Sequence, residues 1–259
     1  CPTLPYGQTK ELVSSNTENR KLEYAPMAHK LRFVGPAISE KEWFNWCVSP
    51  VQAKDGKIHV FTSRWPASYG MEGWSEKDAE IAHFIGDSPE GPFSYVNTVL
   101  KSSMFPDPKT MSAPHNSRVE EVDGKYVLIY ILQNPSDGDT LNKRIMRTGM
   151  MIADDLNGPW RFVGDKGGIV IEPSKDPNHW TYGAVIGTDN PAFEKIGDKY
   201  YIYFKAAIPT QLDARYGYAV ADRLEGPYIM SDGPITDNIS YVEDTDAFSY
   251  QGKHYLLST

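Results

Sequence analysis

The sequence predicts an all-β fold, a β-propeller built of four-stranded blades. Two observations predict it: a β-hairpin pattern occurs four times, and a Gly-Pro-aromatic turn follows each of the first three copies. The glycines of these turns, Gly91, Gly158 and Gly226, are 67 and 68 residues apart. Four-stranded units that repeat along a chain stack radially and bury both faces of each sheet, which is the architecture of a propeller.

Each copy of the hairpin pattern has the same three parts. Polar residues with a proline or an asparagine come first, a short apolar stretch leads to a glycine-containing turn, and a strand rich in aromatic and β-branched residues follows. A turn such as Asp-Gly between apolar runs strongly indicates a β-hairpin. The four copies lie at Trp46–Phe61, Ser112–Tyr130, Thr188–Phe204 and Val242–Leu257.

A return strand and an outer strand complete each unit, on either side of the Gly-Pro turn. The return strands are expected at 79–85, 148–153 and 216–221. We therefore expect a propeller domain over residues 45–259, with repeats at about 45–100, 112–165, 186–232 and 240–259. The segment 69–77 is interpreted as a rim loop, and 164–187 as a long loop between the second and third repeats.

The two ends of the chain are less regular. Residues 1–44 are polar or show no clear period, so they are interpreted as an N-terminal arm. The fourth repeat stops at Thr259, in the middle of a blade. Two interpretations stay open, a fragment of a five-bladed parent and a four-bladed ring closed by its own N-terminus, and we favour the fragment.

The composition argues against several classes of partner. The 26 Lys and Arg residues against 34 Asp and Glu residues give a net charge of −8 without long single-sign runs, which argues against nucleic acid. No stretch approaches the roughly 18 apolar residues of a membrane-spanning helix. Aromatic residues make up 12% of the chain and suit surfaces that stack on sugars, although β-sheets favour aromatics in any case. The oligomeric state is not predicted.

The chain has two cysteines, Cys1 and Cys47, which are too few for a disulfide framework. Cys47 is expected to be a buried thiol rather than a nucleophile. Cys1 has the position of the acylated cysteine of a processed bacterial lipoprotein, although a cloning boundary would look the same. The expected location is therefore periplasmic or extracellular, with a lipid anchor at Cys1 as one reading.

The heads of the four hairpins carry polar residues at matching distances from the lysine that follows each turn. Ten residues before these lysines stand Cys47, His115, Asp189 and Glu243, and nine residues before them stand Val48, Asn116, Asn190 and Asp244. The innermost strands of a propeller run beside its axis, so these positions face one cavity, although adjacent positions point to opposite faces unless a bulge intervenes. The alternative is that Asp and Asn cap turns at strand entry.

Paired carboxylates around a cavity are what glycoside hydrolysis requires, because one group protonates the leaving oxygen while the other activates water or attacks the sugar. A neutral His can replace the acid. Acidic pairs also hold metals, so a divalent cation in the cavity stays open, although no cofactor is expected. The candidate catalytic residues are Asp189, Glu243, Asp244 and His115, and the candidate substrate-binding residues are Trp46, Arg64, Asn116, Arg118, Asn190 and Asp246.

The hairpin heads and the three Gly-Pro-aromatic turns together resemble the five-bladed propeller glycoside hydrolases of families 43, 32 and 117, over residues of about 45 to 259. Family 43 enzymes place an Asp before Pro at the head of inner strands, as general base and as modulator, with a Glu as acid. The resemblance implies such roles for Asp244 and, more loosely, Asp189, whereas Asn116 and Val48 stand at the equivalent heads of the other repeats. Family 117 enzymes use a His as the acid, which implies this role for His115.

The resulting expectation is a secreted or periplasmic, exo-acting glycosidase that acts on an oligo- or polysaccharide through paired carboxylates in the central cavity. A non-catalytic carbohydrate-binding propeller that kept the cavity but lost one acid is the first alternative. An interaction scaffold that binds no sugar is the second. The sugar, the linkage and the stereochemical outcome are not predicted.

Overall fold

The computed structural model of the chain describes residues 32–134, 145–164, 166–184, 186–207, 214–236 and 242–258. The chain divides into two compact units, Cys1–Gly35 and Pro36–Thr259. Most of the first unit lies outside the described residues, and so does Cys1, on which the expectation of a lipid anchor rests. All of the strands named below belong to the second unit. None of the described helices is long and apolar enough to cross a membrane.

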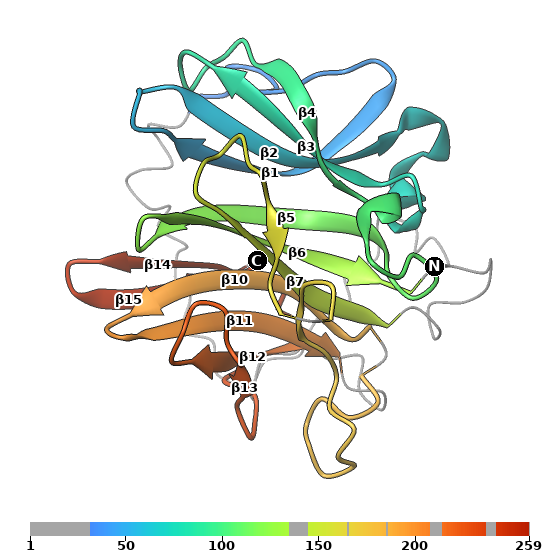
Figure 1. Ribbon diagram of the computed structural model, residues 1–259, viewed down its shortest axis with the longest axis vertical. Coiled ribbons are helices and arrows are strands. Elements are labelled where there is room, and N and C mark those ends of the chain that lie inside the picture. The colour runs from blue at the N-terminus through green and yellow to red at the C-terminus, as the bar shows by residue number, and fades with distance from the viewer. Residues whose placement is uncertain are drawn as a thin grey trace, which may run out of the picture. The chain divides into compact units, whose positions relative to one another are not determined.

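The described strands form antiparallel sheets that follow one another in chain order (Figure 1). The first sheet runs from β1 to β4, with β1 at Trp43–Gln52, β2 at Ile58–Pro66, β3 at Glu80–Gly86 and β4 at Ser94–Lys101. The second contains β5 at Ser112–Val122, β6 at Lys125–Gln133, β7 at Met146–Ala153 and β8 at Arg161–Phe162. Sequence neighbours pair in each sheet, which is the meander of a propeller blade.

The third sheet contains β10 at Thr188–Ile196, β11 at Lys199–Ala207, β12 at Ala214–Ala221 and β13 at Ile229–Met230. In the described part of the fourth repeat, β14 at Asp246–Tyr250 pairs with β15 at Lys253–Leu257. These sheets confirm the predicted all-β propeller fold and the four-stranded unit of its first three repeats.

Two of the predicted loops contain short elements. The loop expected over 164–187 includes β9 at Ile169–Ile171, which pairs with β7 and makes the second sheet five-stranded. The rim loop over 69–77 contains the 3-10 helix η3 at Met71–Ser75, and a second 3-10 helix, η2 at Ala67–Tyr69, ends at the first residue of this loop. A third 3-10 helix, η4, covers Ser102–Met104. The loop predictions therefore hold in position but miss a strand that is too short to show a period.

The Gly-Pro-aromatic turns have the same backbone in all three copies. The glycines Gly91, Gly158 and Gly226 have φ angles of 75°, 85° and 83°, in the region that favours glycine. Each is followed by a cis peptide bond to proline. The sequence marker therefore corresponds to one turn geometry, repeated between the third and fourth strands of each blade.

The hydrophobic core lies between successive sheets. Strands β2 and β6 are buried on both faces, as expected of strands inside a stack of blades. Phe61 and Leu128 belong to the cluster between the first and second sheets, whereas Ile129 and Phe193 belong to the cluster between the second and third. Each such side chain contributes about 1.5–3 kcal/mol when fully buried. This stacking positions the inner strands β1, β5, β10 and β14 side by side.

Candidate active site

Each inner strand has an irregular backbone near its head. The pairing registers of β1, β5 and β10 shift near the start of each strand. One residue at each of these shifts, and one residue just before β14, has a left-handed backbone conformation. The φ angle is 51° at Cys47, 48° at Asn116, 45° at Asn190 and 52° at Asp244. Asn and Asp adopt this conformation more readily than most other non-glycine residues. A bulge re-aims side chains, so these four converge on each other.

The first hairpin is one residue longer than the others, and this corrects the predicted register. Its turn has three residues, Lys54–Gly56, whereas the other hairpins turn over two. Counting back from the lysines assigns Val48 to the level of Asn116, but the left-handed backbone shows that Cys47 has that place. Trp46 therefore stands at the level of His115, Asp189 and Glu243.

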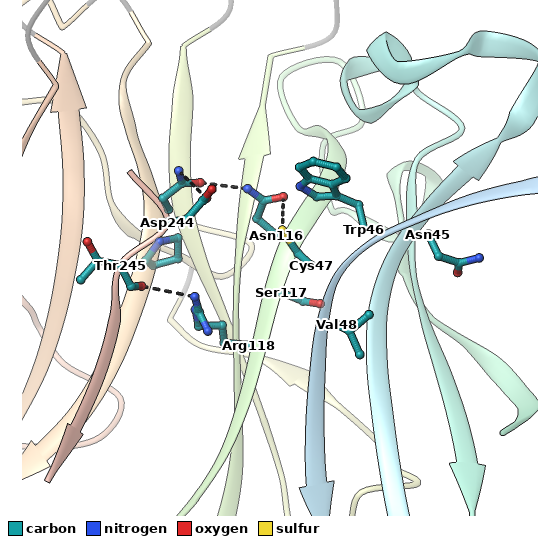
Figure 2. Close-up of a pocket in the computed structure, with 11 residues that line it drawn as sticks. Asn45, Trp46, Cys47, Val48, Asn116, Ser117, Arg118, Asp244 and Thr245 are labelled. Atoms are coloured by element: carbon teal, nitrogen blue, oxygen red, sulfur yellow. Dashed lines mark hydrogen bonds between the residues drawn. The ribbon is translucent and has the colours of Figure 1, made fainter. Parts of the chain in front are cut away.

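The side chains at the left-handed positions form a chain of hydrogen bonds. Cys47 Sγ donates to Asn116 Oδ1 at 3.1 Å, and Asn116 Nδ2 donates to Asn190 Oδ1 at 2.9 Å. Asn190 Nδ2 donates to Asp244 Oδ1 at 3.2 Å and to Glu243 Oε1 at 3.4 Å. We call Cys47, Asn116, Asn190 and Asp244 the head relay. Figure 2 shows the Cys47 thiol facing the Asn116 amide, with Asp244 at the far end.

Two cavities share residues of the head relay. The carboxylate cavity has a volume of about 280 Å³ and is lined by the candidate catalytic residues together with Trp46, Trp74, Met71 and Lys205. The arginine cavity has a volume of about 380 Å³ and contains Arg118 (Figure 2). The residues common to both linings are Trp46, Asn116, Asn190 and Asp244. Both tiers of polar residues that the sequence singles out therefore reach the carboxylate cavity.

A buried lysine links two of the candidate carboxylates. Lys205, on β11, lies opposite Asp189 in the ladder, and its side chain is 2% exposed. Lys205 Nζ contacts Asp189 Oδ2 at 3.3 Å and Glu243 Oε1 at 2.5 Å. Because both oxygens contact one nitrogen, they are at most 5.8 Å apart. The lysine thus holds two carboxylates within reach of one small ligand.

The environment changes how readily these carboxyls ionise. Burial raises the pKa of Asp189 to about 6, a rise that the Lys205 charge opposes and the charges of Glu243 and Asp244 increase. The pKa of Asp244 is also raised, first by burial and then by the charge of Glu243. Among the described residues, Asp189 Oδ1 is buried without a hydrogen-bond partner. The pKa of Asp189 therefore lies near 6, and one of its two oxygens is buried without a hydrogen bond.

His115 is neutral at neutral pH. Burial lowers its pKa to about 4, and the hydrogen bond to Ala113 only partly opposes this. Its Nδ1 lies 2.7 Å from the Ala113 carbonyl oxygen. A carbonyl only accepts, so Nδ1 carries the proton and Nε2 is left as an acceptor. The ring of Trp74 packs against the imidazole at 5.2 Å between centroids.

Two tryptophans and a methionine supply apolar surface to the carboxylate cavity. Trp46 is 41% exposed although it lies in the inner strand β1. Trp74 and Met71 come from the 3-10 helix η3, which lies within the segment expected to be a rim loop. Exposed aromatic rings beside hydrogen-bonding groups suit the apolar faces and hydroxyls of a sugar.

The structure separates Arg118 and Asp246 from the carboxylate cavity. Arg118 Nη1 contacts Asp246 Oδ1 at 3.2 Å, and Nη2 donates to the Thr245 carbonyl at 3.3 Å. Arg118 lines the arginine cavity, whereas Asp246 lines neither cavity in the described part of the chain. The side chains at 118 and 246 therefore form an ion pair along the inner strands, two residues beyond the head relay.

The structure places Arg64, a predicted substrate-binding residue, in the lining of neither cavity. Its side chain is 6% exposed and contacts Glu80 at 2.7 Å and Glu40 at 2.8 Å. The guanidinium also lies over the rings of Trp43 and Tyr95, at 4.2 and 4.3 Å. The sequence suggests that Arg64 lies just past a strand end, among loops that face a ligand, but β2 continues to Pro66 and the two glutamates contact all three guanidinium nitrogens.

Sequence reasoning did not single out Lys205, Trp74 or Met71, which also line the carboxylate cavity. A single lysine within the apolar run Tyr200–Ala207 is a signal that could have found the first, since a buried lysine needs an acidic partner. The other two depend on how η3 folds over the first blade, for which the sequence carries no periodic signal. No group of three or more His, Cys, Asp or Glu side chains within the described ranges is arranged to hold a metal ion.

Solved structures with similar folds match most of the chain. A family 117 glycoside hydrolase produced by the marine bacterium Zobellia galactanivorans has a TM-score of 0.66 and 20% identity, over 84% of this chain and 63% of its own. A thermostable family 43 glycoside hydrolase has a TM-score of 0.50 and 19% identity, over 79% and 61%. The family 32 beta-fructofuranosidase of Bombyx mori has a TM-score of 0.57 and 16% identity, over 83% and 41%.

The chain therefore spans less than two thirds of the length of each of these three proteins. No family model matches the sequence, and no curated protein matches it significantly. At these identities the comparisons establish the fold. The chain has the propeller fold of the glycoside hydrolases of families 117, 43 and 32, which confirms the predicted resemblance.

Proposed function

We propose that the chain carries the active site of a glycoside hydrolase that acts on an oligo- or polysaccharide within the carboxylate cavity. The observation that carries the proposal is the convergence of Asp189, Glu243 and Asp244 on one small cavity beside an exposed tryptophan. Two carboxyl groups in reach of one glycosidic bond are the minimum that acid-base cleavage of that bond needs. The glycoside hydrolase neighbours support the same class of reaction.

Asp189 is the carboxyl best suited to hold the transferable proton. Its pKa of about 6 lies near neutral pH, where a general acid is most effective. Its Oδ1 has no hydrogen-bond partner within the described structure, although it is buried, so a substrate would have to reach it from within the cavity that Asp189 lines. Glu243 is bound to Lys205 and to the Asn190 amide, both of which favour the charged carboxylate. Glu243 is thus placed to activate water or to stabilise the charge that develops on the sugar.

His115 acts in this proposal as a hydrogen-bond acceptor and not as the acid. With a pKa of about 4, the imidazole carries no extra proton at neutral pH. Its Nδ1 proton is committed to the Ala113 carbonyl, so only the Nε2 lone pair is available to a substrate hydroxyl. This assignment departs from the role that the resemblance to family 117 implies.

The size of the carboxylate cavity supports exo-action. About 280 Å³ lies at the small end of ligand cavities, which suits one terminal sugar rather than several internal ones. Trp46 would stack on that sugar, and Asn116 would bind its hydroxyls. One neighbour, the Bombyx mori enzyme, has been solved in complex with sucrose. A polymeric substrate would also fit the proposed periplasmic or extracellular location of the chain.

A carbohydrate-binding propeller without catalysis is the second candidate. It is favoured by one observation: a thiol, Cys47, occupies the head position of the first blade, where a carboxylate would give the cavity another acid. In that case Asp189 and Glu243 would serve only to hold Lys205 and bind hydroxyls. The two candidates differ in whether sugar is released after binding.

An isosteric pair of variants tests the proposal. Asp189→Asn and Glu243→Gln keep the shape of the cavity but remove one carboxyl each. On an oligosaccharide that the wild type cleaves, each variant should lose at least about a hundredfold in kcat while still showing a thermal shift on binding. Asp87→Asn, at an exposed position with a side chain 95% accessible, is the matched control. Unchanged turnover in both cavity variants would refute the assignment.

A further inference from the structure

The head relay runs in one direction. Asp244 as a carboxylate can only accept, so Asn190 must turn its amide nitrogen toward Asp244. The oxygen of the same amide then faces Asn116 and accepts from its nitrogen. The Asn116 nitrogen is used in this bond, so the Asn116 oxygen faces residue 47, which must be a donor. Cys47 meets this demand through its S–H group, at 3.1 Å from the Asn116 oxygen.

The thiol remains a donor at every pH at which the protein would work. Burial raises the pKa of Cys47 to about 12, and the negative charge of Asp244 adds to the rise. A carboxylate at this position would be an acceptor facing an acceptor. It would force Asn116 to turn over and the rest of the relay to follow. A donor at residue 47 is therefore required by the direction that the Asp244 carboxylate gives to the two amides, and it supports that direction from the other end.

We propose that Cys47 is a positioning residue of the carboxylate cavity, whose S–H group starts a one-way relay that holds the Asn190 amide nitrogen against Asp244 and Glu243. The catalytic consequence rests on the proposed function, but the relay itself does not. Cys47 touches neither carboxylate and acts only through Asn116 and Asn190. Its contribution is to keep two hydrogen bonds aimed at the carboxylates that the cavity uses.

Removing the donor should loosen this alignment. In Cys47→Ala the Asn116 oxygen has no donor, so the relay is oriented from the Asp244 end alone and the Asn190 nitrogen is held less firmly on the carboxylates. Loss of one hydrogen bond to a charged carboxylate corresponds to a rise of about one pH unit in its pKa. Cys47→Ser keeps an O–H donor at the same place and should preserve the wild-type alignment.

The first experiment measures the relay without any substrate. The protein is treated with iodoacetamide at pH 9, and the modified peptide that contains Cys47 is quantified by mass spectrometry. Asp244→Asn removes the negative charge at the far end of the head relay, so the two amides are no longer required to point in one direction. The fall in the thiol pKa, roughly half a pH unit or more, should speed alkylation about threefold. The control is Gln52→Ala, at an exposed position of the same strand, which should leave the rate unchanged. Equal rates in wild type and Asp244→Asn would overturn the link between the Cys47 thiol and Asp244 on which the relay depends.

The second experiment measures the consequence for hydrolysis. The acid limb of the pH profile of kcat/KM should move up by about one pH unit in Cys47→Ala and stay in place in Cys47→Ser. Identical profiles in wild type and Cys47→Ala would overturn the positioning role. If the wild type released no sugar from any substrate, the proposed function would fail instead. The alkylation rates would still decide whether the relay exists.

Discussion

Replacing Asp189 by Asn should stabilise the protein in a pH-dependent way. The folded-state pKa of Asp189 is about 6, against 3.8 for an ordinary Asp. At roughly 1.4 kcal/mol per pH unit, this difference corresponds to about 3 kcal/mol. Because the pKa is raised on folding, its favourable contribution is complete below pH 3.8 and is lost as the pH rises through 6. The wild type therefore tolerates a buried charge at neutral pH that the variant lacks.

The assay is urea unfolding followed by tryptophan fluorescence at pH 4.5 and at pH 7.5. Between these two pH values the free energy of unfolding of Asp189→Asn should gain about 2 kcal/mol relative to the wild type. Glu243 remains as a partner for Lys205 in the variant, so the lysine is not left alone. The exposed control Asp87→Asn should stay within about 0.5 kcal/mol of the wild type at both pH values. A difference between Asp189→Asn and wild type that does not change with pH would refute the reasoning.

Three further predictions follow from buried contacts. Lys205→Met leaves Asp189 without its nearby positive charge, so the pKa of that carboxyl should rise above 6, seen as an upward move of the alkaline limb of the pH profile, which reports the general acid. Arg64→Met should lower the free energy of unfolding by about 3–5 kcal/mol, because the buried Glu80 loses its positive partner and keeps only the hydrogen bond from Thr98, while ligand affinity stays unchanged; weakened affinity would place Arg64 in the site. Ser49→Ala removes the acceptor of a buried backbone N–H of β5 and should cost about 1–3 kcal/mol in urea unfolding; no loss would show that this contact between blades is dispensable.

The repeat could be predicted from the sequence because its signals are local. A two-residue turn between apolar runs fixes a hairpin, and the glycine of each Gly-Pro turn has a backbone that other residues avoid. Three of the four copies keep one spacing, so their head residues could be aligned by counting. The first copy has one additional residue, and counting back from Lys57 could not show that this residue lies within the turn. Cys47 and Val48 exchange roles for that reason.

The polar residues of the site could be found, but not all of their partners. Asp189, Glu243 and Asn190 stand out because strands seldom carry such residues at their heads. Lys205 faces Asp189 across a ladder whose register includes a bulge, so the pairing depends on the three-dimensional structure. The opposite case is Arg64, which lines neither cavity and whose partner Glu40 lies outside any predicted strand. In both cases the deciding contact joins segments whose alignment no local pattern specifies.

The central claim is that the carboxylate cavity cleaves a glycosidic bond. The most direct measurement incubates the wild type, Asp189→Asn and Glu243→Gln with a panel of plant and algal oligosaccharides and quantifies the released monosaccharide together with the thermal shift. The account predicts that the wild type releases one sugar from the end of a substrate, and that both variants bind this substrate but release about a hundredfold less. Thermal shifts without release by the wild type, or release that persists in both variants, would contradict it.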